Sequence, residues 1–257
     1  QLFENKKKDI CNIYFTAGFP NLNDTEKIIL TLEKAGADLI EIGMPYSDPL
    51  ADGETIQQSG SVALKNGMNL PLLFEQIASA RAKTNIPLIM MGYFNQVMQY
   101  GEKAFFKKCQ EVGIDGLILP DLPPVIYEAN YQELMQKYNL NNVFLITPQT
   151  PDDRIVYLDS LSSGFVYMVA DASVTGKASD ISNNQIAYFE RIQGMSLKNP
   201  RLIGFGISDH KSFSTACQYA NGAIIGSAFI RALEKADNVE DAIYGFMNRI
   251  LNSEVAV

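Results

Sequence analysis

Short apolar segments recur at regular intervals along this chain of 257 residues. Each segment is nearly continuous in apolar character rather than alternating, which is typical of strands that are buried on both faces. We expect eight strands, at residues 12–16, 38–43, 87–92, 115–120, 142–147, 165–170, 201–206 and 222–227.

Amphipathic segments lie between these strands and predict helices. Residues 24–36 form one such pattern, which we expect to begin with Asp24 as the N-cap and to end at Gly36. Residues 102–113 and 208–222 repeat the design. Each helix is followed by a glycine or asparagine and then by a strand, so the sequence predicts repeated βα units and a parallel sheet.

Eight βα units in a chain of this length match the α/β class, as a (β/α)8 TIM barrel. We expect one domain over residues 1–257, because no Pro/Ser-rich linker or block of charge divides the chain. A doubly wound open sheet is the alternative. In a barrel the reactive groups lie where the strands end, so the candidate chemistry is sought there.

Composition excludes some classes of partner. Lys and Arg number 21 against 29 Asp and Glu, and the net charge of −8 argues against nucleic acid as a partner. Cys11, Cys109 and Cys217 are far apart and form no CxxC pair, which favours buried thiols in a reducing compartment. The polar N-terminus, and the lack of an apolar run near the roughly 18 residues of a membrane helix, predict a soluble cytoplasmic protein that is not bound to a membrane.

Carboxylates are the main candidates for acid–base chemistry. The one histidine, His210, lies in a polar helix start, where we expect it to be solvated. Glu41, in contrast, interrupts an apolar strand within LIEIGMPYSDPLADGETIQ, residues 39–57. Burial would raise its pKa and make it a usable general acid or base near neutral pH. The alternative is a structural glutamate that is bonded to a neighbouring strand.

Asp52 follows Glu41 by eleven residues, in the loop after the same strand. The loop can fold back over the barrel mouth, so that two carboxylates face one pocket and can move two protons in one reaction. Asp48 lies in the same loop. Both aspartates occur in turn sequences, and their alternative role is to shape turns.

Glycine-rich segments predict a phosphate site. GFGIS (204–208) ends the seventh strand and IIGSAFIRAL (224–233) leads from the eighth strand into a helix. Barrels often hold phosphate in these loops, where glycines let backbone N–H groups approach and a helix N-terminus attracts the anion. The candidates are Gly206, Gly226 and Ser227, and the alternative is plain turn geometry. The loop at 173–179 could be a mobile lid or a surface loop without a role.

The chain resembles the alpha subunits of tryptophan synthase over nearly its whole length. The resemblance rests on YFTAGFP (14–20), residues 39–57, MGYFN (91–95), DGLILPDLP (115–123), SVTG (173–176), GFGIS and GSAFI. It implies a (β/α)8-barrel carbon–carbon lyase of tryptophan biosynthesis, which cleaves indole-3-glycerol phosphate to indole and glyceraldehyde 3-phosphate without a metal or organic cofactor of its own. It also implies a beta-subunit partner, in an alpha2beta2 heterotetramer, that holds pyridoxal phosphate and receives indole through a tunnel.

The resemblance also implies roles for individual residues. Glu41 and Asp52 match the family's catalytic carboxylates. The substrate-binding positions match Tyr14, Tyr167, Thr175 and Phe205, and the phosphate-binding positions match Gly176, Gly206, Gly226 and Ser227. Tyr14 and Phe205 would pack on the indole, and Thr175 would take part in loop closure. The chain departs from the family pattern at Ala170, Ser173 and Glu54.

Three other functions stay open from the sequence. A stand-alone lyase that releases free indole would share every one of these residues. Another phosphate-binding barrel enzyme, such as an isomerase or cyclase, would not explain the segment from Glu41 to Asp52. A barrel kept mainly as a binding subunit would not need intact carboxylates. The loops at 45–57, 93–101 and 120–125 are the expected surface for a beta subunit.

Overall fold

The structure is a computed structural model that describes residues 1–49, 52–170, 182–204 and 206–253. Within these residues, parallel strands form one sheet in the order β5-β4-β3-β2-β1-β9-β8-β7-β6. The strands are β1 (Ile10–Thr16), β2 (Leu39–Gly43), β3 (Leu88–Met91), β4 (Gly116–Ile118), β5 (Asn141–Val143), β6 (Leu145–Ile146), β7 (Val166–Val169), β8 (Arg201–Gly204) and β9 (Gly222–Ile225).

The sheet closes into a barrel through one residue. β5 and β6 stand at opposite ends of the strand order, yet only Phe144 separates them along the chain. The Tyr167 N–H donates to the Phe144 carbonyl at 3.0 Å, so this residue also contacts β7. β5 and β6 are therefore two pieces of the strand predicted at 142–147. The eight predicted strands are confirmed, and the open doubly wound sheet is wrong.

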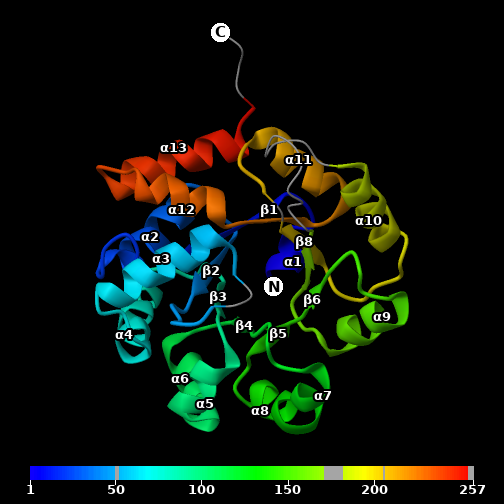
Figure 1. The fold of residues 1–257 in the computed structure, drawn as a ribbon, viewed down its shortest axis with the longest axis horizontal. Coiled ribbons are helices and arrows are strands. Elements are labelled where there is room, and N and C mark those ends of the chain that lie inside the picture. The colour runs from blue at the N-terminus through cyan, green and yellow to red at the C-terminus, as the bar shows by residue number, and fades with distance from the viewer. Residues whose placement is uncertain (50–51, 171–181, 205, 254–257) are drawn as a thin grey trace.

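Helices surround the strands as an outer ring (Figure 1). The described helical elements are α1 (Leu2–Asn5), α2 (Asp24–Lys34), α3 (Glu54–Lys65), α4 (Leu70–Arg81), α5 (Phe94–Tyr100), α6 (Glu102–Val112), α7 (Pro124–Ile126), the π-helical turn η1 (Tyr127–Tyr131), α8 (Gln132–Lys137), α9 (Asp152–Leu161), α10 (Asn183–Gln193), α11 (His210–Tyr219), α12 (Ser227–Glu234) and α13 (Val239–Leu251). Of these described elements, only α1 lies inside the ring in the view of Figure 1. The alternation of strands with covering helices explains why the strands are apolar on both faces.

The helix ends follow the predicted signals with one exception. α6 ends before Gly113, which takes the left-handed φ of 80° that glycine adopts readily. α11 begins after Asp209, whose carboxylate accepts a backbone N–H of the first turn. The prediction of Asp24 as an N-cap is wrong, because α2 already includes Asp24 and its N-cap is Asn23. The Asp24 carboxylate is instead bonded to the Asn21 side chain at 2.8 Å.

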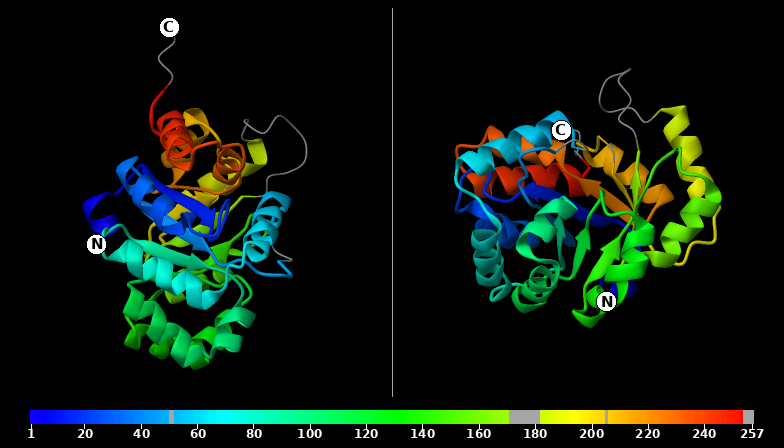
Figure 2. Two further views of the ribbon diagram at one scale, coloured as in Figure 1. Left: turned by 90° about the vertical axis from the view of Figure 1, so that its left-hand side faces the viewer. Right: turned by 60° about the horizontal axis from the view of Figure 1, so that its bottom comes forward.

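The core has two layers, one between strands and helices and one inside the barrel. The inner layer consists of Ile10, Leu39, Ile89, Ile118, Val143, Phe165, Leu202 and Ile224. Leu2 and Phe3 of α1 pack against it, with the rings of Phe3 and Phe165 centred 6.0 Å apart. Seen from the side, the N-terminus lies at the opposite end of the molecule from α3 (Figure 2). α1 therefore closes the N-terminal end of the barrel.

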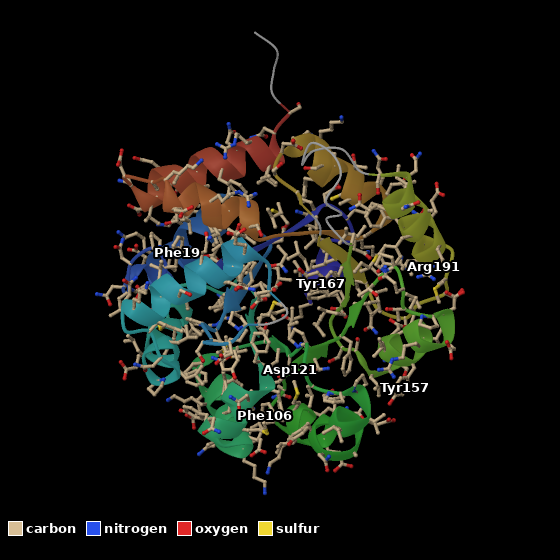
Figure 3. All side chains as sticks on the ribbon, in the orientation of Figure 1. Phe19, Phe106, Asp121, Tyr157, Tyr167 and Arg191 are labelled. Carbon is tan, nitrogen blue, oxygen red and sulfur yellow. The ribbon has the colours of Figure 1, made fainter. Side chains whose placement is uncertain are left out.

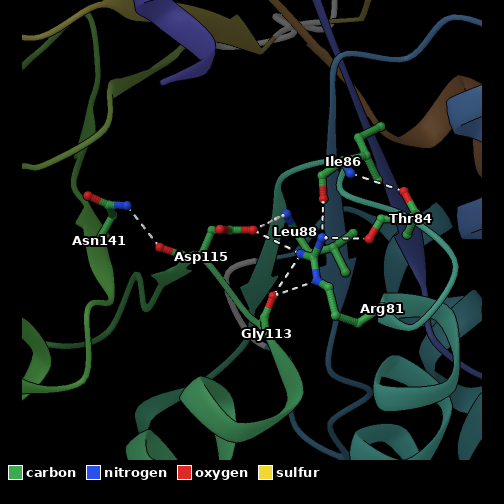
Figure 4. Close-up of polar contacts among 7 residues, drawn as sticks. All are labelled: Arg81, Thr84, Ile86, Leu88, Gly113, Asp115 and Asn141. Carbon is green, nitrogen blue, oxygen red and sulfur yellow. Dashed lines mark hydrogen bonds and ion pairs between the residues drawn. The ribbon is translucent and has the colours of Figure 1, made fainter.

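A polar network joins the starts of three strands at this closed end (Figure 4). Arg81 at the end of α4 donates to the Gly113 carbonyl at 2.7 and 2.9 Å and to the Asp115 carboxylate at 3.0 Å. Asp115 also accepts the Leu88 N–H at 2.8 Å, and its carbonyl accepts from Asn141. The network ties β3, β4 and β5 together before any of them enters the barrel.

Two predictions from composition bear on the described residues. Cys11, Cys109 and Cys217 are free and buried, which confirms the expectation of buried thiols. In the part of the chain that the structure describes, no helix combines the length and apolar character needed to cross a membrane.

Candidate active site

A cavity of about 340 Å³ opens at the C-terminal ends of the strands. Seven of the predicted site residues contribute to its lining: Tyr14, Glu41, Asp52, Tyr167, Gly206, Gly226 and Ser227. Figure 3 shows Tyr167 near the middle of the ring of strands. The other predicted site residues, Thr175, Gly176 and Phe205, lie outside the described residues, as does Ser173. Every predicted site residue that the structure describes is therefore brought to one cavity.

Glu41 lies in the middle of β2 with its side chain fully buried. Its Oε2 accepts a hydrogen bond from Asn12 Nδ2 at 3.1 Å, whereas Oε1 has no partner among the described residues. Burial raises the pKa of Glu41 to about 8, and the charge of Asp52 acts in the same direction, while the Asn12 hydrogen bond opposes them. Glu41 is thus protonated at neutral pH. The structural alternative accounts for Oε2 only, since Oε1 has no hydrogen-bond partner among the described residues.

Asp52 lies just before α3 and faces the same cavity. Its Oδ2 accepts from the Tyr93 hydroxyl at 3.2 Å, and its carbonyl accepts from Gln57 Nε2 at 2.8 Å. Tyr46 stacks on Tyr93 with ring centres 5.0 Å apart. Partial burial raises the pKa of Asp52, and the Tyr93 hydrogen bond opposes this. Asp52 is therefore held by neighbouring loops, not only by its own turn.

Tyr14 and Tyr167 supply aromatic walls to the cavity. Burial raises the pKa of both phenols, and the charge of Glu41 adds to this, so both hydroxyls stay neutral. Each ring lies against a glycine at the end of a strand. A Cβ atom on Gly43 would lie 2.1 Å from the Tyr14 hydroxyl, and one on Gly204 would lie 2.5 Å from the Tyr167 ring. Only glycine at these two positions leaves room for the aromatic walls.

The start of α12 provides a site for an anion. Gly226 is the N-cap, and α12 has neither a capping side-chain bond nor an acidic residue in its first turn. Gly226, Ser227 and Ala228 line the cavity, together with Gly206 from the loop after β8. The N–H groups of a helix's first turn have no partner within the helix, and together with the helix dipole they favour a negative group here.

Three residues of the site were not found from the sequence. Asn12 bonds Glu41 and Tyr93 bonds Asp52, as described above. Arg231 lines the cavity one helical turn after Ser227, and its Nη1 donates to Thr55 Oγ1 at 3.3 Å. The spacing of Arg231 from Ser227 could have identified it, because residues i and i+4 share a helix face.

Other candidates lie away from the cavity. His210 is partly buried, with Nδ1 bonded to the Ile250 carbonyl at 2.9 Å and Nε2 to Ser214 Oγ at 3.1 Å. The prediction of a solvated histidine is therefore wrong, although His210 is absent from the cavity lining, as is Asp48. Glu54 is exposed at the start of α3, where the helix dipole favours a carboxylate.

Comparison with known proteins decides the family. The model of the tryptophan synthase alpha chain family matches residues 2–254. The chain belongs to this family. The tryptophan synthase alpha chain of Flavobacterium psychrophilum is 57% identical over 97% of each chain, and that of Christiangramia forsetii is 58% identical over 88% of each chain. The tryptophan synthase A-subunit of Pyrococcus furiosus superimposes with a TM-score of 0.87 at 32% identity, covering 95% of this chain and 98% of that one.

Membership of the tryptophan synthase alpha chain family confirms the TIM barrel and the predicted activity. The protein is a carbon–carbon lyase of tryptophan biosynthesis that cleaves indole-3-glycerol phosphate. The alternative of an unrelated barrel isomerase or cyclase is wrong. The chain is also similar to a Pyrococcus furiosus tryptophan synthase complex, with a TM-score of 0.87 at 31% identity over 95% of this chain and 98% of that one. An alpha chain implies a beta-subunit partner.

Proposed function

We propose that Glu41 and Asp52 carry out the retro-aldol cleavage of indole-3-glycerol phosphate in this alpha chain. The observation that carries the proposal is the state of Glu41. Its carboxyl group is fully buried, retains one oxygen without a partner among the described residues, has a pKa of about 8, and shares a cavity with Asp52. A carboxyl group in this state can donate a proton at neutral pH and take one back.

The first step is proton donation. Direct cleavage would leave poorly stabilised charge on the indole ring. Protonated Glu41 therefore donates its proton to indole C3, and the ring becomes an indolenine cation that can accept an electron pair. Ionised Asp52 accepts a hydrogen bond from the ring N–H and stabilises the positive charge as it develops.

The second step breaks the carbon–carbon bond. The Glu41 carboxylate removes the proton of the glycerol hydroxyl next to the bond. The hydroxyl oxygen forms a carbonyl, the bond to C3 breaks, and its electron pair returns to the ring. Indole and glyceraldehyde 3-phosphate result, and Glu41 is protonated again for the next cycle. One residue with a pKa near neutrality can serve both steps.

Substrate orientation comes from groups that do not react. Tyr14 and Tyr167 contact the indole, with Phe205 as a further aromatic contact implied by the family. Gly206, Gly226, Ser227 and the start of α12 hold the phosphate, which anchors the reacting carbon near Glu41. For Thr175 and Gly176 the proposed roles, loop closure and a further phosphate contact, rest on the family resemblance.

The finer assembly is also a proposal. We expect an alpha2beta2 heterotetramer in which indole passes through a tunnel to the beta subunit. The segments that follow β3 and β4 fit the contact surface, because Met98 of α5 and Val125 and Ile126 of α7 are exposed apolar side chains. The cytoplasm is the expected compartment, since the three buried cysteines are free thiols.

An indole-release assay tests the proposal. Purified protein is given indole-3-glycerol phosphate with and without a cognate beta subunit, and indole is measured directly. We expect cleavage that rises when the beta subunit is added, with complex formation seen by gel filtration. Lack of cleavage in both conditions would contradict the assignment. High turnover without any complex would favour the stand-alone lyase that releases free indole.

A further inference from the structure

A buried asparagine lies directly below the cavity, on the strand next to Glu41. Side chains of β1 alternate between the two faces of the barrel wall. Ile10 belongs to the inner core layer and Tyr14 lines the cavity, so Asn12, midway between them, also faces inward. Asn12 is absent from the cavity lining and its side chain is fully buried. It therefore lies beneath the site, where a substrate does not reach it.

Stability does not account for an asparagine at this place. The neighbouring inward positions on β1 and β2 include Ile10 and Leu39, which are apolar. Burial of an amide costs free energy unless its polar atoms are bonded. Asn12 Oδ1 has no partner among the described residues, and Nδ2 donates to Glu41 Oε2 at 3.1 Å. An aliphatic side chain would fill the same space without an unpaired oxygen, so the bond to Glu41 is the feature that needs this residue.

We infer that Asn12 is a positioning residue for Glu41, which fixes Oε2 from below and leaves Oε1 as the oxygen that exchanges protons with the substrate. The inference rests on the proposed role of Glu41 as the proton donor. It assigns different tasks to the two carboxyl oxygens. Asn12 Nδ2 donates to Oε2 at 3.1 Å, and Oε1 is buried without a partner in the part of the chain that the structure describes.

Asn12 also shifts the pKa of Glu41 in the direction opposite to burial and to the charge of Asp52. The charge of Asp52 disfavours the Glu41 carboxylate, and Tyr14 and Tyr167 are neutral phenols that carry no positive charge to stabilise it. Arg231 lies farther out, as an exposed residue of the cavity lining. The Asn12 N–H donor favours the charged form and so lowers the pKa of Glu41. Without Asn12, Glu41 would hold its proton more tightly and donate it more slowly.

The pH dependence of cleavage by Asn12→Leu tests this inference in the complete alpha chain with its beta subunit. Activity depends on protonated Glu41, so it falls at alkaline pH. Removal of the donor should move the alkaline midpoint upward by roughly one pH unit and lower kcat at pH 7 roughly tenfold. The KM should change less than about twofold, because Asn12 does not contact the substrate. An unchanged midpoint would overturn the inference.

Asn142→Leu is the matched control. Asn142 on β5 is another buried amide, only 2% exposed, and its Nδ2 has no hydrogen-bond partner among the described residues. Its replacement also removes a buried amide from the barrel but leaves Glu41 untouched, so the alkaline midpoint should stay in place. Asn12→Asp provides a second variant of nearly the same size. It replaces the donor with a carboxyl group, and the midpoint should move in the same direction as in Asn12→Leu.

NMR tests the contact in the unmodified protein. The side-chain amide resonances of Asn12 should shift as Glu41 titrates, and this shift should vanish in Glu41→Gln. Failure of the inference and failure of the proposed function give different results. If Glu41→Gln keeps normal turnover, the proposed function is wrong. If Glu41→Gln is inactive while the Asn12 resonances do not titrate, only the role of Asn12 is wrong.

Discussion

The same strands form both ends of the barrel, but Arg81 at the N-terminal end and Glu41 at the C-terminal end differ in how fully their polar atoms are bonded. At the N-terminal end, Arg81 donates to backbone carbonyls and to Asp115, whose carboxylate also accepts a backbone N–H (Figure 4). At the C-terminal end, Glu41 keeps one buried oxygen without a partner among the described residues. Satisfied polar groups stabilise a fold, whereas a buried group left unsatisfied calls for another explanation.

The bonding of their oxygens distinguishes two carboxyl groups, Asp115 and Glu41, that occur in similar settings in the sequence. Asp115 and Glu41 both lie beside apolar strand segments. Asp115 pairs with a guanidinium at 3.0 Å and its side chain is 51% exposed, so its charge is compensated. Glu41 is fully buried and bonded only by the neutral Asn12 amide among the described residues. A carboxyl group without a cation, next to a cavity, is suited to proton transfer rather than to stability.

The strongest test of this comparison is Glu41→Gln. The amide keeps the shape of the side chain but cannot donate a proton to indole C3. We expect kcat to fall roughly 10²–10⁴-fold, with substrate still bound. Steady-state indole release measures the loss, and Glu75→Gln, an exposed glutamate on α4, serves as the control with normal turnover. Near-normal turnover of Glu41→Gln would remove Glu41 from the mechanism.

Asp52→Asn should have the next largest effect. An amide at this position can accept the ring N–H hydrogen bond but does not offset a developing positive charge. We therefore expect kcat to fall by roughly 10²-fold, with a smaller change in KM. Asp48→Asn in the same loop is the matched control, because Asp48 does not line the cavity. If the kcat of Asp52→Asn stays within a few-fold of the parent, Asp52 serves only to shape its turn.

The sequence predicted the fold well because its signals are local. Apolar segments, helix caps and the recurring αβ turns each depend on a few neighbouring residues. The break of the fifth strand at Phe144 could not be predicted, because it arises where the ring of strands closes. The error at Asp24 has a similar cause, since that carboxylate is already bonded to Asn21.

The site was predictable only in part. Glu41 was found because a charge stands out in an apolar strand. Asn12 begins the predicted strand at 12–16 and is neutral, so no signal of this kind marked it as a site residue. Its contact with Glu41 depends on how β1 aligns with β2, which the sequence does not specify. The bonds from Tyr93 to Asp52 and from Arg81 to Asp115 likewise join segments far apart in the chain.

Arg81→Met tests the closed end of the barrel. The substitution removes the guanidinium that donates to the Gly113 carbonyl and to the Asp115 carboxylate. Both acceptors then lose hydrogen bonds. We expect the free energy of unfolding to fall by about 2 kcal/mol, measured by urea denaturation, with kcat unchanged. Lys83→Met is the control, since the Lys83 side chain is 55% exposed against 21% for Arg81, and its pair with Glu26 should contribute little. A large loss of turnover with an unchanged free energy of unfolding would contradict the role of Arg81 in stability.

Arg81→Met should lower the free energy of unfolding, whereas Glu41→Gln should raise it relative to the parent as the pH increases. The pKa of Glu41 is about 8 in the folded protein, against about 4.3 in an unfolded chain. Between these pH values the folded state binds the extra proton, so the Glu41 contribution to stability falls as pH rises. Relative to the parent, Glu41→Gln should therefore become more stable from pH 5 to pH 8 in urea denaturation. A constant difference over this range would show that Glu41 titrates normally.

Arg231→Gln addresses the anion site and should have the smallest effect. Arg231 lines the cavity one turn beyond Ser227, but it is exposed, so water and salt screen its charge. We expect the KM for indole-3-glycerol phosphate to rise roughly three- to tenfold at low salt and less at high salt, with kcat nearly unchanged. Arg249→Gln on α13 makes the same change in net charge away from the cavity and is the control.

Arg231→Lys separates charge from geometry at this position. Lysine keeps the positive charge but does not reproduce the guanidinium contact to Thr55, which is 3.3 Å long. If attraction of the phosphate is the main contribution, Arg231→Lys should retain the KM of the parent. If Lys and Gln instead raise the KM equally, or if kcat falls while the KM stays constant, Arg231 acts by holding the start of α3 beside Asp52. The mouth of the barrel would then contain one more structural contact of the kind found at its closed end.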